Sequence, residues 1–190
     1  MKKEERYSRV YPVEQAGSLE NRLRKLVQNP RTILKLYIRP GITVLDLGCG
    51  PGFFSIEIAK MLNGSGKVIA ADLQEGMLEK VETKIRGTLL EKKIELHKCE
   101  ADRIGLKSKV DFILAFYVVH EIKDHKLLFE EMKALLKPDG KICIVEPSFH
   151  VSRNTFKDMI RNLMKAGFEV SQAPKILFSR SIIAADPFGN

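Results

Sequence analysis

The sequence predicts an α/β fold: a doubly wound, mostly parallel seven-stranded sheet with helices on both faces, an antiparallel last strand and an N-terminal helical lid. From residue 42 onward, short runs of β-branched and aliphatic residues alternate with stretches of helical periodicity. Such alternation implies right-handed crossovers and a parallel sheet that is covered on both faces. Only a short turn separates the last two strand-like runs, so these two strands are expected to be antiparallel.

Seven segments of the chain are expected to form strands. In chain order they are "ITVLDL" (42–47), "KVIAADL" (67–73), "KIELHKCEAD" (93–102), "VDFILAFYVV" (110–119), "KICIVEP" (141–147), "EVSQAPKIL" (169–177) and "FSRSIIAAD" (178–186). The helices expected between them are "FFSIEIAKML" (53–62), "EGMLEKVETKIRGTLL" (75–90), "DHKLLFEEMKALL" (124–136) and "NTFKDMIRNLMKAGF" (154–168).

Turn and cap signals divide these elements. "NGSG" (63–66) marks a loop, and Lys137-Pro138-Asp139-Gly140 is a strong helix stop. Asn154 is expected to cap the last helix at its start, with Gly167 near its end.

The first 40 residues do not follow the alternation. "SLENRLRKLVQN" (18–29) has its leucines on one helical face, and Asn29-Pro30 is expected to start a second helix over "RTILKLYI" (31–38). We therefore expect residues 1–40 to form a helical lid or brace over the ligand edge of the sheet. They hold ten Lys or Arg against four Glu, most of the net charge of +8. Such a basic segment could contact RNA, an anionic membrane surface or an acidic substrate, or could be a solvated helix face.

Composition narrows the class of protein. The chain is 44% hydrophobic and 29% charged, as in ordinary globular proteins. Its longest apolar run, residues 112–119, is far shorter than the roughly 20 residues that span a bilayer. Cys49, Cys99 and Cys143 are scattered without a CxxC pair, which argues against disulfides or a zinc site and favours the reducing cytoplasm.

The stretch "VLDLGCGPG" (44–52) ends the first strand in a glycine-rich turn. Phe53 stands where the dinucleotide pattern GxGxxG requires glycine, which weakens a dehydrogenase interpretation. A phosphate-binding P-loop needs GK[ST], and no lysine is present here. A ligand that approaches the backbone closely without a phosphate suits this turn, and S-adenosylmethionine is such a ligand.

Four ordered motifs over about residues 40–150 give the chain a family resemblance. They are "VLDLGCGPG", "VIAADLQEGML" (68–78), "CEADRI" (99–104) and "LLKPDGKICIVE" (135–146). Together they resemble the class I (Rossmann-like) S-adenosylmethionine-dependent methyltransferases, most closely the branch of the ubiquinone and menaquinone C-methyltransferases. Asp139 departs from the family's "LKPGG" turn by replacing its first glycine. The resemblance implies that residues 41–190 form a Rossmann-like methyltransferase domain.

The resemblance also implies a set of cofactor-binding residues. In this family the glycines approach the methionine and ribose portions, the acidic residue at the second strand's end holds the ribose hydroxyls, and the loop after the third strand contacts adenine. Carried over, the set is Asp46, Gly48, Cys49, Gly50, Gly52, Asp72, Leu73, Met77, Ala101, Asp102, Arg103, Ala115 and Phe116. Asp46 would face the cationic amino group or an ordered water, and Leu73 and Met77 would form apolar walls for adenine.

Methyl transfer from a sulfonium is an in-line displacement, which can be catalysed largely by holding the reactants in contact. The residues available at the mouth of the site are Ala115, Phe116, Tyr117, His120, Glu121, Glu146 and His150. We expect His120 and Glu121 to act as acid or base and Tyr117 to complete the catalytic set. The sequence leaves open whether His120 instead caps the following helix or fills the core. The histidines of "HEIKDH" are five residues apart, not four as in HExxH, so no metal is expected.

The methyl acceptor is expected to be a small, partly apolar metabolite. The [DN]PP[YF] turn of amino-group methylases of DNA is absent from "AFYVVHE", residues 115–121. Two other hypotheses stay open: an RNA methyltransferase that uses the basic N-terminal segment, and a non-catalytic S-adenosylmethionine-binding module. Oligomeric state cannot be read from the sequence.

Overall fold

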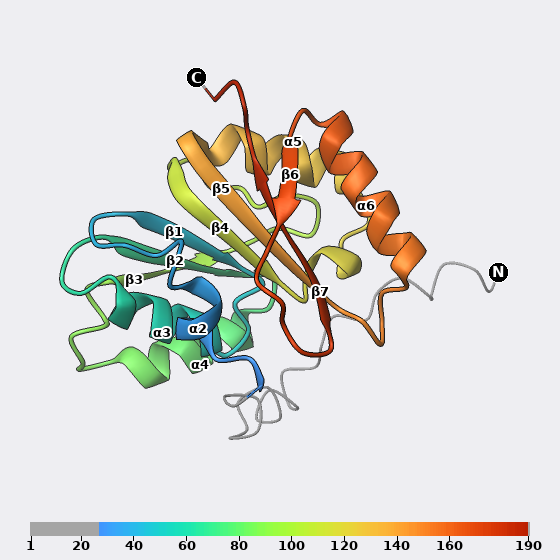
Figure 1. The fold of residues 1–190 in the computed structure, drawn as a ribbon. Helices are drawn as coiled ribbons and strands as arrows, with labels where there is room; N and C mark the ends of the chain where they lie inside the picture. The colour runs from blue at the N-terminus through green and yellow to red at the C-terminus, as the bar shows by residue number, and fades with distance from the viewer. Residues whose placement is uncertain (1–26, 190) are drawn as a thin grey trace.

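The computed structural model describes residues 27–189, which form one seven-stranded sheet between two layers of helices (Figure 1). The strand order is β3-β2-β1-β4-β5-β7-β6. The first five strands are parallel, and β7 is antiparallel to both of its neighbours. The strands are β1 Thr43–Leu47, β2 Lys67–Asp72, β3 Ile94–Lys98, β4 Val110–Phe116, β5 Leu136–Pro147, β6 Glu169–Gln172 and β7 Ser179–Ala185. The predicted fold class is confirmed.

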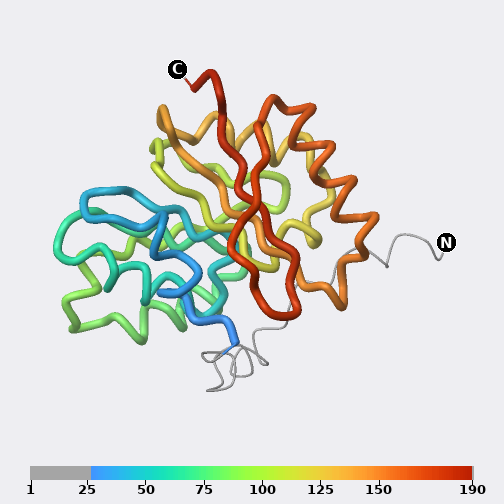
Figure 2. Tube along the Cα trace, viewed as in Figure 1, coloured from blue at the N-terminus to red at the C-terminus, as the bar shows by residue number. Residues whose placement is uncertain are grey.

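Helices cover both faces of the sheet (Figure 1). They are α2 Pro30–Leu34, α3 Phe53–Met61, α4 Glu75–Ile85, α5 His125–Leu135 and α6 Arg153–Lys165, with the 3-10 helix η3 at Val119–Glu121. Helices α2, α3 and α4 pack on one face, and α5 and α6 on the other, as the trace in Figure 2 also shows. No helix within residues 27–189 is long and apolar enough to cross a membrane.

The order of the strands reverses between β1 and β4, which lie side by side with Leu47 beside Ala115. The segments that leave β1 and β4 turn to opposite faces of the sheet, and in open α/β sheets this is the place where a ligand crevice is expected. The glycine turn follows β1 directly, and the residues after β4 lead into η3. The topology therefore brings these two segments together at one edge of the sheet.

The observed elements differ from the expected ones at several of their ends. Strand β3 ends at Lys98 and β4 at Phe116, earlier than expected, while β5 begins at Leu136, five residues before the expected start. Helix α4 ends at Ile85, because Arg86 leaves the helical conformation and Gly87 has a φ of +71°. Strand β6 covers only the first four residues of the expected 169–177. The prediction that Asn154 caps α6 was wrong: the helix begins one residue earlier, and the Ser152 hydroxyl accepts a hydrogen bond from the Thr155 amide at 3.1 Å.

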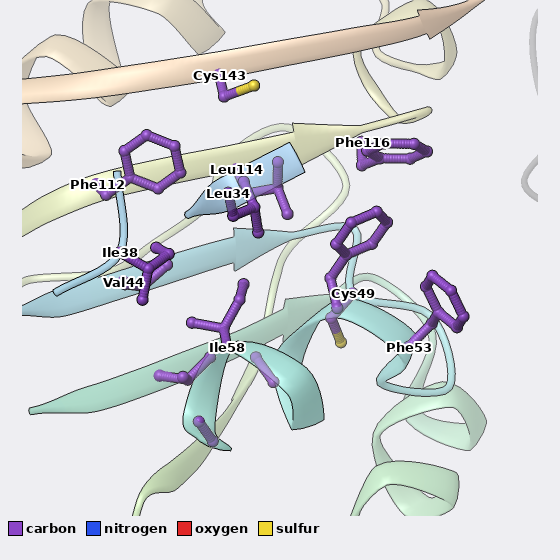
Figure 3. Packing of buried hydrophobic residues seen from close by; sticks show 14 of the residues in the cluster. Leu34, Ile38, Val44, Cys49, Phe53, Ile58, Phe112, Leu114, Phe116 and Cys143 are labelled. Atoms are coloured by element: carbon purple, nitrogen blue, oxygen red, sulfur yellow. The ribbon is translucent and has the colours of Figure 1, made fainter. Parts of the chain in front are cut away.

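Two apolar layers hold the helices to the sheet. On one face, Val44 of β1 and Leu114 of β4 pack with Ile58 of α3, which is fully buried (Figure 3). On the other face, Leu45 and Ile113 of the same strands pack with the buried Phe129 of α5 and its neighbours. Successive strand residues point to opposite faces, so continuous apolar runs are required where both faces are covered.

The described part of the expected N-terminal lid packs onto the α3 face of the sheet. Asn29 caps α2 as expected, its side chain accepting a hydrogen bond from the Arg31 amide. Leu34 and Ile38 are buried against the sheet, and the Tyr37 ring stacks on Phe112 with 5.5 Å between centroids. Burial of a leucine side chain contributes about 1.5–3 kcal/mol, so packing holds this five-residue helix in place. The helix expected over residues 18–29 lies almost entirely outside the described residues.

The segment "LKPDG" forms an irregular start of β5, where the register with β4 shifts, and its backbone explains why glycine suits the position of Asp139. This residue has a φ of +62°, in the left-handed region that costs a side-chain-bearing residue about 1–2 kcal/mol. The segment itself is held by an ion pair between Lys137 and Asp111 at 2.7 Å. The family's usual glycine would adopt the same conformation without that cost.

Replacing Asp139 with glycine should therefore stabilise the protein. We expect Asp139→Gly to raise the free energy of unfolding by up to about 1 kcal/mol, since relief of strain exceeds the entropy that glycine gains in the unfolded chain. Urea denaturation of the full chain measures the change. The matched control is Asp158→Gly inside α6, where φ is ordinary; it should destabilise, and a gain there would contradict the conformational explanation.

Candidate functional site

The glycine turn after β1 is folded against the end of β2. The amides of Gly48 and Cys49 both donate to the Ala71 carbonyl, at 2.8 and 3.0 Å. Gly48, Gly50 and Gly52 have φ values of +69°, +53° and +89°. Three left-handed residues in five positions are accessible only to glycine at acceptable cost. The turn therefore exposes backbone rather than side chains at the edge of the sheet.

Asp72, the last residue of β2, holds this turn in place through hydrogen bonds. Its Oδ2 accepts a hydrogen bond from the Gly50 amide and its Oδ1 accepts one from the Gln74 amide, both at 2.9 Å. Burial raises the pKa of Asp72 above its ordinary value, and the amides of Gln74, Gly50 and Leu73 oppose that rise. Each carboxylate oxygen retains further acceptor capacity beyond its one amide. The carboxylate can thus hold the turn and still accept from a ligand.

Two glycines also make room for neighbouring elements. A Cβ atom on Gly48 would lie 2.6 Å from Cγ2 of Val118, just after β4. A Cβ on Gly52 would lie 3.1 Å from Cγ2 of Val81 in α4. The turn is therefore packed between the segment after β4 and helix α4, and Gly48 is the tighter position.

Asp46 and Cys49 lie behind the turn, within the protein. Asp46 is 1% exposed, and its Oδ2 accepts a hydrogen bond from the Ser55 hydroxyl of α3. Burial raises the pKa of the Cys49 thiol well above its ordinary value, and the charges of Asp46 and Asp72 add to the effect. A thiol held neutral in this way is a poor nucleophile.

The other expected cofactor residues flank Asp72. Leu73 is 39% exposed, and Met77 in α4 is buried. The Cys99 amide donates to the Asp72 carbonyl and so brings the loop after β3 beside the end of β2. The remaining residues of this loop, Ala101, Asp102 and Arg103, are exposed.

Two residues at the end of β4 complete the expected cofactor set. The Ala115 side chain is buried in the layer beneath α5 and α6, so any contact it makes with a ligand runs through its backbone. The Phe116 ring lies on the opposite face, 4.3 Å from the Phe54 ring and 4.5 Å from the Tyr117 ring, measured between centroids. These rings connect the start of α3 with the segment after β4.

On the other side of the crevice, His120 of η3 pairs with Glu146 of β5. Nδ1 of His120 forms a hydrogen bond with Oε2 of Glu146. The Glu146 side chain is 1% exposed and that of His120 is 22% exposed. Burial lowers the pKa of His120, but the hydrogen bond and charge of Glu146, aided by Glu121, outweigh it and raise that pKa above 6.5. His120 therefore neither caps the helix that follows nor fills the core; it lies partly exposed on a buried carboxylate.

Glu121 lies between the two halves of the site. Burial raises its pKa from 4.5 to about 7; the charges of Asp72 and Glu146 also raise it, while His120 lowers it. The charges of Asp72, which ends β2, and of Glu146 in β5 are both close enough to act on the pKa of Glu121. This carboxyl group changes protonation near neutral pH.

Tyr117 has a strained backbone and a well-bonded side chain. Its φ is +63°, a conformation that costs a residue with a side chain about 1–3 kcal/mol. Its hydroxyl accepts a hydrogen bond from Nε2 of Gln28 at 2.7 Å and lies 2.6 Å from the Ser179 hydroxyl. Tyr117 therefore connects the N-terminal segment to the start of β7.

Several of these residues are not marked by any motif in the sequence. Glu146 was among the residues expected at the mouth of the site. Its only signal in the sequence is that it is an acidic residue near the end of an apolar strand. Gln28 and Ser179 carry no sequence signal, because their partner, Tyr117, lies far away along the chain. Ser55 lies only nine residues from its partner, Asp46, but no motif marks it. Among residues 27–189, no group of three or more His, Cys, Asp or Glu side chains could hold a metal ion.

Comparison with known proteins identifies the class. Residues 38–177 match the family described as "Methyltransferase domain". A crystal structure of an S-adenosylmethionine-dependent methyltransferase from Aquifex aeolicus has a TM-score of 0.82 and 27% sequence identity, over 92% of this chain and 98% of that chain. The chain therefore belongs to the methyltransferase-domain family, in the class I S-adenosylmethionine-dependent group. The predicted class of protein and its cofactor, S-adenosylmethionine, are confirmed.

Curated relatives indicate the branch of this family. The demethylmenaquinone methyltransferase of Lactobacillus johnsonii is 35% identical over 115 residues, which are 60% of this chain and 47% of that protein. The ubiquinone/menaquinone biosynthesis C-methyltransferase of Shewanella oneidensis is 26% identical over 122 residues, 62% of this chain and 49% of that protein. The predicted resemblance to this branch is confirmed. The chain spans about half the length of the curated relatives it matches.

The packing of the glycine turn predicts a large effect of Gly48→Ala. Both the left-handed backbone and the clash with Val118 oppose a methyl group there, so we expect a loss of at least about 2 kcal/mol in the free energy of unfolding. The matched control is Gly87→Ala, with a φ of +71° and nothing within 4 Å of the added Cβ. Urea denaturation of both variants separates strain from clash. Equal losses would show that Val118 does not restrict the turn.

The raised pKa of Glu121 predicts a pH-dependent effect of Glu121→Gln. The pKa of Glu121 is about 7 in the folded protein and 4.5 in the unfolded chain. The stability that the protonated group contributes is therefore lost as the pH rises from about 4.5 to 7. The difference in unfolding free energy, variant minus wild type, should therefore be larger at pH 8 than at pH 5, by on the order of 1 kcal/mol. Urea denaturation at both pH values measures the difference. The control is Glu79→Gln in α4, which removes the same charge from an exposed position. An effect of Glu121→Gln that is identical at both pH values would contradict burial of the carboxyl.

Proposed function

We propose that the protein transfers the methyl group of S-adenosylmethionine to a small, partly apolar metabolite by in-line displacement. The observation that carries the proposal is the arrangement at the point where strand order reverses. There the backbone of the glycine turn and the Asp72 carboxylate lie on one side of the crevice, and the His120–Glu146 pair on the other. Ligands of open parallel sheets bind at this place.

The residues of the turn suit the cofactor. Its exposed backbone permits close approach, and Asp72 keeps acceptor capacity for ribose hydroxyls. Leu73 and the loop of Ala101, Asp102 and Arg103 would enclose adenine, with Met77 packed beneath. Asp72, Glu121 and Glu146 make this edge acidic, which suits a cationic sulfonium. When bound, S-adenosylmethionine would supply an electrophilic methyl group.

The protein's own residues would then position the acceptor and control its proton. Tyr117, directly after β4, would offer a partly exposed aromatic ring that packs on the buried Phe116. His120 and Glu121 are the acid–base groups proposed to act there. Holding an acceptor in contact with a methyl group can contribute roughly 7–11 kcal/mol to catalysis. The names of the relatives, demethylmenaquinone methyltransferase and ubiquinone/menaquinone biosynthesis C-methyltransferase, support an acceptor with a ring and apolar surface.

The same proposal covers the domain organisation and the location of the protein. Residues 1–40 would act as a lid or brace beside residues 41–190, and the contact from Gln28 to Tyr117 supports this role. Cys49, Cys99 and Cys143 are all free and buried, which favours the reducing cytoplasm. Most of the basic segment lies outside the described residues, so an RNA substrate stays an alternative that the site does not favour.

The cofactor site predicts the effect of Asp72→Asn. We expect the affinity for S-adenosylmethionine to fall at least about tenfold, because a charge-assisted hydrogen bond contributes roughly 1.5–3 kcal/mol. Isothermal titration calorimetry on the full chain measures it. Asp111→Asn is the matched control: this carboxylate also accepts from a backbone amide, that of Thr43, but at the opposite ends of the strands. Unchanged affinity in Asp72→Asn, or equal losses in both variants, would contradict the proposed site.

A further inference from the structure

Glu146 has a buried oxygen without a partner. Within residues 27–189, its Oε1 is the buried side-chain oxygen that forms no hydrogen bond. The side chain is 1% exposed and lies at the carboxyl end of β5, and its Oε2 is taken by His120. A buried acceptor left unpaired costs roughly 1–3 kcal/mol. The carboxylate is therefore enclosed by the protein, and among the described residues its hydrogen-bond partner is His120.

The same carboxylate determines which nitrogen of His120 is free. An ionised carboxylate can only accept, so Nδ1 must carry a hydrogen and donate it to Oε2. In the neutral ring Nε2 then holds the lone pair. No partner of Nε2 occurs in the part of the chain described, and the His120 side chain is 22% exposed. Nε2 is therefore the ring atom left to take a proton.

The charges around the pair select against an anionic acceptor. Glu121 follows His120 directly and interacts with both Glu146 and Asp72. The ring of His150, from the loop after β5, lies 6.0 Å from that of His120 between centroids. Arg180 of β7 stands opposite Glu146 in register, and its guanidinium donates to the Val151 carbonyl at 2.7 Å. Carboxylates predominate, so a neutral acceptor with a donor group suits the site better than a phosphate or carboxylate.

We propose that Glu146 is a positioning residue that fixes the tautomer of His120, so that Nε2 removes the proton of a neutral, acidic hydroxyl on a phenol- or enol-type acceptor. This inference rests on the proposed function and names the chemical class of its acceptor. A histidine matches the proton of such a hydroxyl far better than that of an aliphatic alcohol, because proton transfer is most efficient between groups of similar pKa. The partly exposed aromatic ring of Tyr117 suits a planar acceptor.

The step balances without a further reactant. As the hydroxyl proton passes to Nε2 of His120, the acceptor's electron pair, from oxygen or from the conjugated carbon, forms the bond to the methyl carbon. The bond from that carbon to sulfur breaks, and its electron pair stays on sulfur, which becomes a neutral thioether. If carbon is methylated, the hydrogen on that carbon leaves to solvent as the ring is restored. His120 ends as an imidazolium beside Glu146 and returns its proton to water.

Nuclear magnetic resonance of the full chain labelled with ¹⁵N-histidine tests the positioning role without any acceptor. Long-range ¹H–¹⁵N spectra distinguish the two tautomers, and the spectrum of His120→Gln assigns the signal. We expect the Nδ1–H form in wild type above the pKa of His120. In Glu146→Gln that pKa should fall, since the buried counter-charge is gone. An Nε2–H tautomer in wild type would overturn the proposal, even if the Glu146→Gln variant does not fold. An unchanged pKa of His120 in a folded Glu146→Gln variant would also overturn it.

Three naphthalene probes test the acceptor class in the presence of S-adenosylhomocysteine. We expect 1-naphthol to shift the Nε2 resonance of His120, and naphthalene-1-methanol and 1-naphthyl phosphate to leave it in place. With S-adenosylmethionine, any turnover of 1-naphthol should fall by at least about 100-fold in His120→Gln. A shift caused equally by all three probes, or only by the phosphate, or by none, would overturn the acceptor class. Failure of the proposed function itself is separate: the wild type would then show no calorimetric binding of S-adenosylmethionine.

Discussion

The hydrogen bond from the Gly50 amide to the Asp72 carboxylate is the contact on which the site depends. It ties the turn after β1 to the end of β2, and the Ala71 carbonyl adds two further bonds to the same turn. Because the turn cannot move away from β2, the start of α3 is fixed with it. A single carboxylate thus determines both the backbone of the predicted cofactor site and the direction of the helix that follows.

From this turn, a series of packed rings reaches the other half of the crevice. Phe54, in the first turn of α3, contacts Phe116, and Phe116 contacts Tyr117. The Tyr117 hydroxyl then binds Gln28 and lies beside Ser179. The left-handed backbone of Tyr117 directs the chain into η3, where His120 and Glu121 follow. The two halves of the candidate site are therefore connected by side chains in contact with one another.

The carboxylates of the site repel one another, and a cationic ligand would reduce this repulsion. Asp72 and Glu146 are buried, and burial together with their charges raises the pKa of Glu121 to about 7. A cation bound among these groups would favour their ionised forms and lower that pKa again. A cationic cofactor and a neutral, donor-bearing acceptor would thus be complementary to the same set of side chains. The electrostatics of the site and the chemistry of methyl transfer point in one direction.

The sequence by itself determined the class of fold, because strand and helix periodicities are local and alternate regularly along the chain. It also located the glycine turn and Asp72, since both belong to short motifs that the backbone geometry requires. The sequence did not determine every helix end. Ser152 and Asn154 are both residues that commonly cap helices, and the structure has Ser152 as the cap of α6. The pairing of His120 with Glu146, the contact of Gln28 with Tyr117 and the burial of Glu121 were decided by the tertiary structure alone. Each depends on residues from separate strands and loops meeting at one edge of the sheet, and no local pattern records which distant side chain will arrive there.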